Sequence, residues 1–220
     1  FNTHKTIELA QKAARQKAVL AIFPELGLSA YSNDDLFHQD ALLKSVEKAL
    51  VTIKEASAKL NLIIACGAPL QVDCRLFNCA VVFYRGDILG IAVKSYLPNY
   101  REYYEVRQFS PASTALASTI TLAGQKDIPF GANLIFKAAN VKYFNLFFEI
   151  CEDVWVPIPP SSFAAMAGAT IIGNLSASNI TIGKAEYRQQ LAANQSARCI
   201  AAYLYADAGF GESTTDLAWD

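Results

Sequence analysis

The sequence predicts an α/β fold in which helices cover a mixed sheet. Short continuous apolar runs, such as residues 19–23, alternate with longer segments of helical character, and such runs are typical of strands buried on both faces. Residues 78–84 and 88–93 are strand-like runs joined by Arg85-Gly86-Asp87, which predicts an antiparallel hairpin in the sheet. Hydrophobic residues make up 53% of the 220 residues and charged residues 18%, which is enough for a substantial core between helices and sheet.

The predicted elements follow one another along the chain without a linker or a repeat, so we predict one domain over residues 1–220. Helices are predicted at residues 3–17, at residues 43–60, in a short segment that Ser161 or Ser162 caps and that ends near Gly168, and at residues 185–198. Strands are predicted at residues 19–23, 62–66, 78–84, 88–93, 144–150, 169–175 and 200–205, the second being ended by Gly67 and Pro69. Residues 31–40 are predicted as a loop and residues 110–128 as loops around an edge strand.

Charge and cysteine content argue against several classes of function. The formal net charge of -1 disfavours a nucleic-acid or membrane-surface partner, and no apolar stretch reaches the roughly 18 to 20 residues that span a bilayer. The five cysteines are odd in number and form no Cys-x-x-Cys pair, which disfavours a disulfide framework, and the two histidines lie in no metal-ligand pattern. We therefore expect no nucleic-acid partner, no membrane association and no metal site.

Three apolar runs each end at a side chain that can take part in chemistry. Residues 19–24 lead to Glu25, residues 88–93 to Lys94, and the strand that ends at residue 150 leads to Cys151. In sheets covered by helices, sites form beyond the strand ends, so these three side chains can converge although they lie far apart in the sequence.

A thiol, a carboxylate and an ammonium in one pocket would support hydrolysis of a carboxamide. Cys151 would be the nucleophile, and Glu25 would take the thiol proton and pass it to the leaving amine. Lys94 would lower the pKa of the thiol and, with the backbone N–H of Glu152, stabilise the oxyanion. Taken singly, such residues are more often inert core cysteines or solvated charges, so the pattern alone leaves amide hydrolysis a hypothesis.

Five sequence blocks resemble those of a known enzyme family. They are FPELGLSAY (23–31), KSYLPNYREYYE (94–105), EICED (149–153), NLSASN followed by GK (174–184), and GESTTDL (211–217). In this order, and over nearly the whole chain, they resemble the nitrilase superfamily of carbon-nitrogen hydrolases, in the form of the glutaminase domain of glutamine-dependent NAD+ synthetases. The resemblance implies a nitrilase-like four-layer α-β-β-α sandwich with mixed sheets.

The resemblance also implies the catalytic residues. It gives Glu25 as general base, Lys94 as the oxyanion and positioning residue, and Cys151 as the nucleophile that forms a thioester. Glu102 resembles a second glutamate of related amidases, although an acid in a charged loop has a surface role equally often.

Six further residues are implied for binding L-glutamine. Tyr100, Ser178 and Lys184 match positions that hold the backbone groups of glutamine. Position 184 is Arg in some relatives and Lys here, and a lysine cannot form the bidentate contact of a guanidinium. Glu152 is implied to meet the α-ammonium. Tyr31 and Trp155 are implied to wall the pocket, with plain core packing as the alternative for both.

Membership of such an enzyme implies partners outside this chain. The ammonia would amidate deamido-NAD+ in an ATP-dependent synthetase domain that uses ATP with Mg, and no phosphate loop of that domain occurs here. We therefore expect a C-N hydrolase domain that needs no cofactor, is truncated at both ends, lies in the cytoplasm, and forms homo-oligomers. A stand-alone nitrilase-like amidase for another small amide and a catalytically silent assembly module are the alternatives.

Overall fold

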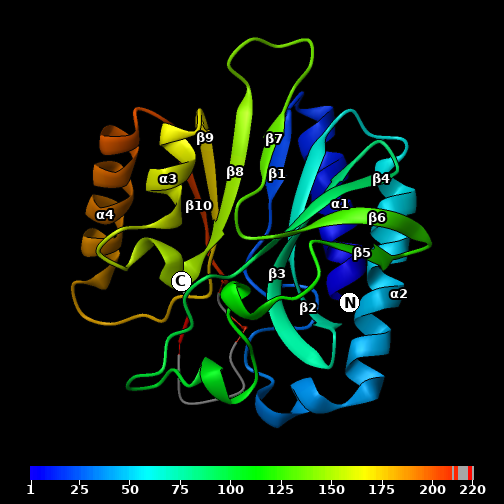
Figure 1. The fold of residues 1–220 in the computed structure, drawn as a ribbon, viewed down its shortest axis with the longest axis horizontal. Coiled ribbons are helices and arrows are strands. Elements are labelled where there is room, and N and C mark those ends of the chain that lie inside the picture. Colours follow the sequence, from blue (N-terminus) through cyan, green and yellow to red (C-terminus); the bar gives the residue numbers. More distant parts are fainter. Residues whose placement is uncertain (210, 213–217, 220) are drawn as a thin grey trace.

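The computed structural model describes residues 1–209, 211–212 and 218–219. In the described part of the chain, two sheets lie face to face between two pairs of helices, and this order of layers is visible in Figure 1. The helices are α1 (Asn2–Arg15), α2 (Asp40–Ser57), α3 (Pro160–Met166) and α4 (Lys184–Cys199). The strands are β1 (Leu20–Ile22), β2 (Ile63–Val72), β3 (Arg75–Tyr84), β4 (Asp87–Val93), β5 (Thr119–Leu122), β6 (Gln125–Gly131), β7 (Ile135–Lys137), β8 (Asn145–Ile150), β9 (Ile171–Leu175) and β10 (Ala202–Ala206). The predicted four-layer α-β-β-α sandwich is confirmed.

Both sheets are mixed, as predicted. The larger sheet has the order β1-β2-β3-β4-β6-β5, with β1 parallel to β2 and the β3–β4 hairpin antiparallel. The smaller sheet has the order β10-β9-β8-β7, in which β8, β9 and β10 are parallel and the three-residue strand β7 is antiparallel to β8. Strand β7 was not predicted, because three residues are too few for a clear alternation of apolar and polar side chains.

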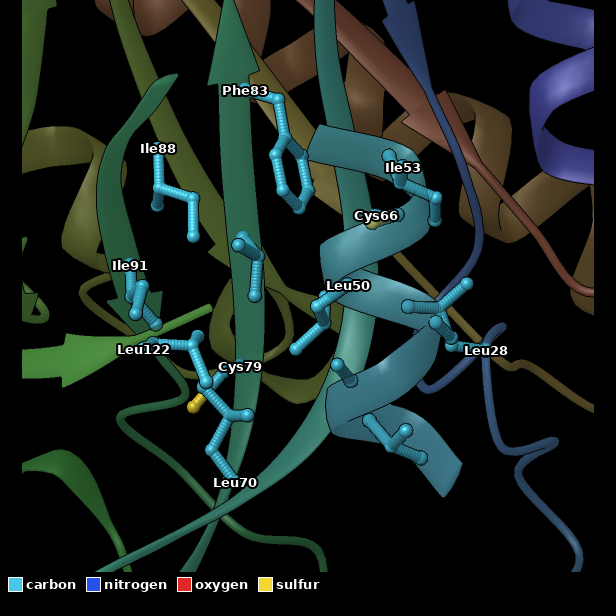
Figure 2. Close-up of a cluster of buried hydrophobic side chains, with 14 of the residues drawn as sticks. Leu28, Leu50, Ile53, Cys66, Leu70, Cys79, Phe83, Ile88, Ile91 and Leu122 are labelled. Carbon is cyan, nitrogen blue, oxygen red and sulfur yellow. The ribbon is translucent and has the colours of Figure 1, made fainter. Parts of the chain in front are cut away.

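The first apolar layer lies between the helix pair α1 and α2 and the large sheet. Leu50 and Ile53 are fully buried on the inner face of α2, as their spacing predicted. Figure 2 shows them beside the strands that carry Cys66, Cys79 and Phe83. The two cysteines are therefore packing residues, and burial raises the pKa of each thiol well above its usual range.

The second apolar layer lies between the two sheets and contains small side chains on one side. Ala65, Ala80 and Ala92 of the large sheet face Phe148 and its neighbours on β8. Small residues on one sheet and an aromatic ring on the other allow the two sheets to approach without a void. A third, smaller layer packs α3 and α4 on the outer face of the small sheet.

Strand β2 does not end at Gly67 and Pro69, contrary to the sequence prediction. It continues to Val72 and pairs with β3 over its whole length, with Pro69 opposite Asn78. Strand β1 pairs with β2 only as far as Ala65. At Pro69 no second strand of the described chain lies on that side, so a proline, which lacks an N–H, interrupts no hydrogen-bond ladder with β1. Gly67 is required because a Cβ there would lie 2.2 Å from the backbone nitrogen of Leu26. The glycine marks a close approach of two chain segments.

Three smaller predictions also change. Strand β1 is an edge strand of intermediate burial rather than one buried on both faces, since the large sheet ends there. Neither Ser161 nor Ser162 caps α3, because Pro160 occupies its first turn and fits that position without a side-chain cap. The predicted loop at residues 31–40 contains a short 3-10 helix, Asp34–His38. In the described residues, no helix has the length and apolar character needed to cross a membrane.

Candidate active site

The site lies where β1, β4 and β8 end, at one edge of the gap between the two sheets. Lys94 directly follows β4, and its Nζ donates a hydrogen bond of 2.6 Å to Oε1 of Glu25, three residues beyond β1. Both side chains are buried, with exposures of 0% and 1%. The backbone N–H of Ala177, beyond β9, donates to the other oxygen of Glu25 at 2.9 Å. Two of the three predicted residues are therefore in direct contact.

A second carboxylate reaches Lys94, and it belongs to Glu105. The Nζ of Lys94 lies 2.7 and 2.9 Å from the two oxygens of Glu105, which is 4% exposed. Glu102, the residue singled out from the sequence, instead accepts a hydrogen bond of 2.6 Å from Asn179. Both glutamates belong to the block at residues 94–105, and the short 3-10 helix Glu105–Arg107 turns Glu105 inward. Spacing alone could not distinguish them.

Asn78 is a further residue that the sequence did not reveal. It is fully buried on β3, and its Nδ2 donates to Oε1 of Glu25 at 2.7 Å. Glu25 thus receives three hydrogen bonds, from an amide side chain, an ammonium and a backbone N–H, which hold its carboxylate in one orientation. An asparagine within an apolar strand was the available signal, because a buried amide needs polar partners.

The charges in this cluster shift one another's pKa values. The pKa of Glu25 is raised to about 7, because burial and the nearby negative charge of Glu105 together outweigh the lowering effect of the Lys94 ammonium. Burial alone would lower the pKa of Lys94, but the two carboxylates reverse this and raise it well above the usual value. Lys94 is therefore a permanent cation, whereas Glu25 can gain and lose a proton near neutral pH.

Cys151 lies at the turn between β8 and a short 3-10 helix, Cys151–Val154, with a left-handed φ of 44°. Its Sγ lies 3.8 Å from the carbonyl oxygen of Ala177, the residue whose N–H is bound to Glu25. Its own N–H donates to Oδ1 of Asn174 at 3.2 Å. A non-glycine residue in this conformation at a strand end marks a strained, sharp turn of the backbone.

The thiol of Cys151 is not activated at rest in the way the sequence suggested. Burial, followed by the negative charge of Glu25, raises its pKa well above the usual value, and Lys94 offsets only part of this. The sequence-based expectation of a lowered pKa took account of the Lys94 ammonium but not of burial, the largest cause of the rise, nor of the negative charges of Glu25 and Glu105. The resting group is therefore a thiol that needs a base at the moment of attack.

Cys151 opens into a cavity of about 470 Å³. Its lining includes six of the residues predicted to act on the substrate: Tyr100, Glu102, Glu152, Trp155, Ser178 and Lys184. The hydroxyl of Tyr100 donates to Glu152 at 2.9 Å, and Lys184 lies 5.6 Å from the ring centre of Trp155. Burial lowers the pKa of Lys184. The cavity thus presents a cation, acids and aromatic walls to a small polar molecule.

Ser178 offers this cavity a hydroxyl without a partner. The side chain is 2% exposed, and among the described residues its Oγ has no hydrogen-bond partner. Its backbone N–H donates to Asp207 at 2.8 Å, which fixes the residue in place. A buried hydroxyl with no partner is costly, so a polar ligand atom would satisfy it.

Tyr31 does not line the cavity at Cys151. Its hydroxyl donates to Glu105 at 2.7 Å, and its ring packs edge-on against Trp219. It lines an adjoining cavity of about 280 Å³ on the other side of Tyr103. The backbone N–H of Tyr31 donates to the carboxylate of Glu212, whereas residues 213–217 of the predicted fifth block lie outside the described residues.

Within the described residues, no three His, Cys, Asp or Glu side chains are grouped so that they could hold a metal ion. The buried acids at this site contact a lysine, an asparagine and backbone N–H groups.

Comparison with known proteins shows the family to which the chain belongs. The family model described as carbon-nitrogen hydrolase matches residues 2–215. The chain belongs to the carbon-nitrogen hydrolase family. It is 51% identical over 219 residues to a protein of Mycobacterium tuberculosis named glutamine-dependent NAD(+) synthetase. That match covers 100% of this chain and 32% of the relative, so this carbon-nitrogen hydrolase chain spans about a third of the relative's length.

Solved structures agree with the family. A glutamine-dependent NAD(+) synthetase from Cytophaga hutchinsonii is similar with a TM-score of 0.84 and 27% identity, over 100% of this chain and 35% of that one. An amidase of the nitrilase superfamily from Nesterenkonia has a TM-score of 0.78 at 16% identity, over 100% of this chain and 73% of that one, which supports the fold alone. The resemblance read from the sequence blocks is confirmed.

Proposed function

We propose that this chain hydrolyses L-glutamine to glutamate and ammonia. The observation that carries the proposal is the buried cluster of Lys94 with Glu25 and Glu105, next to the thiol of Cys151 at the mouth of a polar cavity. The high identity to proteins named glutamine-dependent NAD(+) synthetase supports glutamine as the amide.

The first half of the reaction releases ammonia. Glu25 takes the thiol proton as Sγ of Cys151 attacks the side-chain amide carbon, which is consistent with the raised pKa values of both groups. The charge of Lys94 and the N–H of Glu152 stabilise the oxyanion. When the C–N bond breaks, Glu25 returns its proton to the leaving nitrogen, and a thioester on Cys151 remains.

The second half hydrolyses the thioester. Glu25 takes a proton from a water molecule whose oxygen attacks the thioester carbon, and the same groups stabilise the second oxyanion. The C–S bond then breaks, and the sulfur recovers its proton from Glu25. Glu105 stays hydrogen-bonded to Lys94 through both of its oxygens and holds the ammonium in position, a role that we assign to it in place of Glu102.

Glutamine would be held by the far end of the cavity. Lys184 would pair with the α-carboxylate, and Glu152 would meet the α-ammonium with Tyr100 hydrogen-bonded behind it. The free hydroxyl of Ser178 would complete the recognition, and Trp155 would wall the pocket. A single-point contact by Lys184 gives less geometric control than an arginine would.

The chain would serve a longer enzyme. We infer that its ammonia is used by a synthetase domain to amidate deamido-NAD+ with ATP and Mg, that residues 1–220 form the hydrolase domain of that protein, and that the protein is a cytoplasmic homo-oligomer. The names of the relatives, and the third of their length that this chain spans, support the synthetase domain as the user of the ammonia.

Ammonia release from a panel of amides tests the proposal. Glutamine should give the highest kcat/KM among glutamine, asparagine and simple aliphatic amides. A better aliphatic substrate would instead identify a stand-alone amidase.

The Cys151→Ala variant tests the nucleophile. Its turnover should fall by at least about 10⁴-fold, because the thioester can no longer form. Cys79→Ala, the same truncation at a fully buried cysteine of the core, serves as the control and should keep its kcat. Unchanged ammonia release by Cys151→Ala would refute a catalytic site, as the silent-module alternative requires.

A further inference from the structure

One buried carboxylate next to the nucleophile has no role in the mechanism above. Asp153 is 1% exposed and lies two residues after Cys151. Its Oδ2 accepts the backbone N–H of Ile150 at 2.9 Å, directly before the nucleophile. Its Oδ1 accepts the N–H groups of Ser95 and Tyr96 at 3.1 and 2.9 Å, directly after Lys94.

These three hydrogen bonds join two segments that share no strand ladder. Lys94 follows β4 of the large sheet, and Cys151 follows β8 of the small sheet. The two sheets meet there mainly through apolar side chains. Apolar contacts are non-directional, so they do not fix how the end of β4 lies relative to the end of β8. A carboxylate that binds backbone on both sides fixes this relative position, because hydrogen bonds constrain distance and angle.

We propose that Asp153 is a positioning residue that ties the Cys151 turn to the Lys94 segment and so sets the distance between nucleophile and ammonium. The proposal rests on the proposed amide hydrolysis, although not on glutamine as the amide. Asp153 touches neither reacting atoms nor the cavity, so it acts through its two neighbours.

The hydrogen-bond pattern calls for a carboxylate at this position. Every described partner of Asp153 is an N–H donor, and only the ionised form accepts at both oxygens without an unmatched proton. Burial and the nearby charge of Glu149 raise the pKa of Asp153 to about 8, and the N–H groups of Ile150 and Tyr96 oppose this rise because they favour the ionised form. In an asparagine at position 153, the side-chain NH2 would face a backbone N–H group where Asp153 has an accepting oxygen.

The Asp153→Asn variant of the 220-residue chain tests this role, assayed with whichever amide the unaltered chain hydrolyses fastest. We expect kcat to fall roughly 10²-fold, since a misplacement of about 1 Å costs that much, and KM to change less than about threefold because no cavity residue is altered. Asp153→Ser, which is small and leaves room for water, should show the same split if the asparagine variant folds poorly. Leu50→Ala, which loses stability in the α2 core, is the control and should lower the melting temperature without lowering kcat.

Crystal structures of the variants give the second measurement. In Asp153→Asn, the Cys151 turn should move away from Ser95 while the contact between Lys94 and Glu25 persists. A wild-type kcat in a folded Asp153 variant, or a loss of kcat in Leu50→Ala as large as in Asp153→Asn, would overturn the positioning role. If the unaltered chain hydrolyses another amide but not glutamine, the proposed substrate fails while this test still applies; if it hydrolyses no amide, both proposals fail.

Discussion

The core beneath α2 and the cluster at the strand ends are equally buried and chemically opposite. Leu50 and Ile53 are 0% exposed among other hydrocarbon side chains, and Lys94 is 0% exposed between two carboxylates. In the core, each side chain is stabilised by removal from water and by many weak contacts, so no single partner is essential. In the cluster, each charge is tolerable only because its partner is present.

This difference separates stability from function. An apolar core stabilises the fold without dictating the position of any one atom to chemical accuracy. The buried ion pairs cost desolvation free energy, and they fix the positions of the Glu25 and Glu105 carboxylates and of the Lys94 ammonium. Loss of a core contact should therefore reduce stability alone, and loss of a cluster contact should reduce both stability and turnover.

Among the variants that compare the core with the charged cluster, the largest combined effect on stability and turnover is expected for Lys94→Met. It leaves Glu25 and Glu105 buried without a cation, which should lower the free energy of unfolding by about 3–5 kcal/mol and turnover by at least about 10³-fold. Urea unfolding and ammonia release measure the two effects. The stability deficit should be smaller at pH 5 than at pH 8, because Glu25, with its pKa raised to about 7, is protonated at the lower pH. A deficit that grows on acidification would contradict the assignment.

Gly67→Ala should come next. Its Cβ would lie 2.2 Å from the nitrogen of Leu26 and 2.5 Å from the oxygen of Pro24, so the segment that carries Glu25 must shift. We expect kcat to fall about 10²-fold. Gly124→Ala is the matched control, since its Cβ meets nothing within 4 Å and its φ of 72° adds only local strain far from the site. Equal losses of kcat in both variants would show that the contact at Gly67 is not special.

Leu50→Ala should change stability without changing chemistry. Truncation of a fully buried leucine in a close-packed core should cost about 2–5 kcal/mol of unfolding free energy, seen as a lower urea midpoint. Turnover per folded molecule should stay within about twofold of the unaltered chain. A large loss of kcat in the folded variant would break the separation between the two regions.

The last expected effect, which needs no change in the cluster, is the pH dependence of kcat/KM. Glu25 must be a carboxylate to accept the thiol proton, and its raised pKa of about 7 means that activity should rise roughly tenfold per pH unit below 7 and level off above it. Burial raises the pKa of Glu149 as well. The Glu149→Gln variant should nevertheless show the same rise of kcat/KM with pH, because this side chain contacts Tyr203 and the start of α3. A kcat/KM profile that is flat between pH 5 and 7 would exclude Glu25 as the titrating base.

Much of the fold and part of the site could be predicted from the sequence. The β3–β4 hairpin was predicted because its turn residues and flanking apolar runs are local signals. Gly67 and Pro69 were misread as the end of a strand, because both residues usually interrupt strands and their partners lie far away in the sequence. Glu105 was missed in favour of Glu102, since only the turn at residues 105–107 decides which acid faces Lys94.

The sequence by itself determined most of the helices and strands, and that a thiol, an acid and an amine follow three of the strands, because periodicity and strand ends are signals carried by neighbouring residues. Only the tertiary structure decided which acids share Lys94, that Asn78 and Asp153 hold the site together, and that the Cys151 thiol keeps its proton at rest. These outcomes depend on burial and on distances of a few ångströms between residues that are 11 to 69 positions apart in the sequence. Electrostatic free energy depends on these distances and on the exclusion of water, and neither quantity has a local signature in the chain.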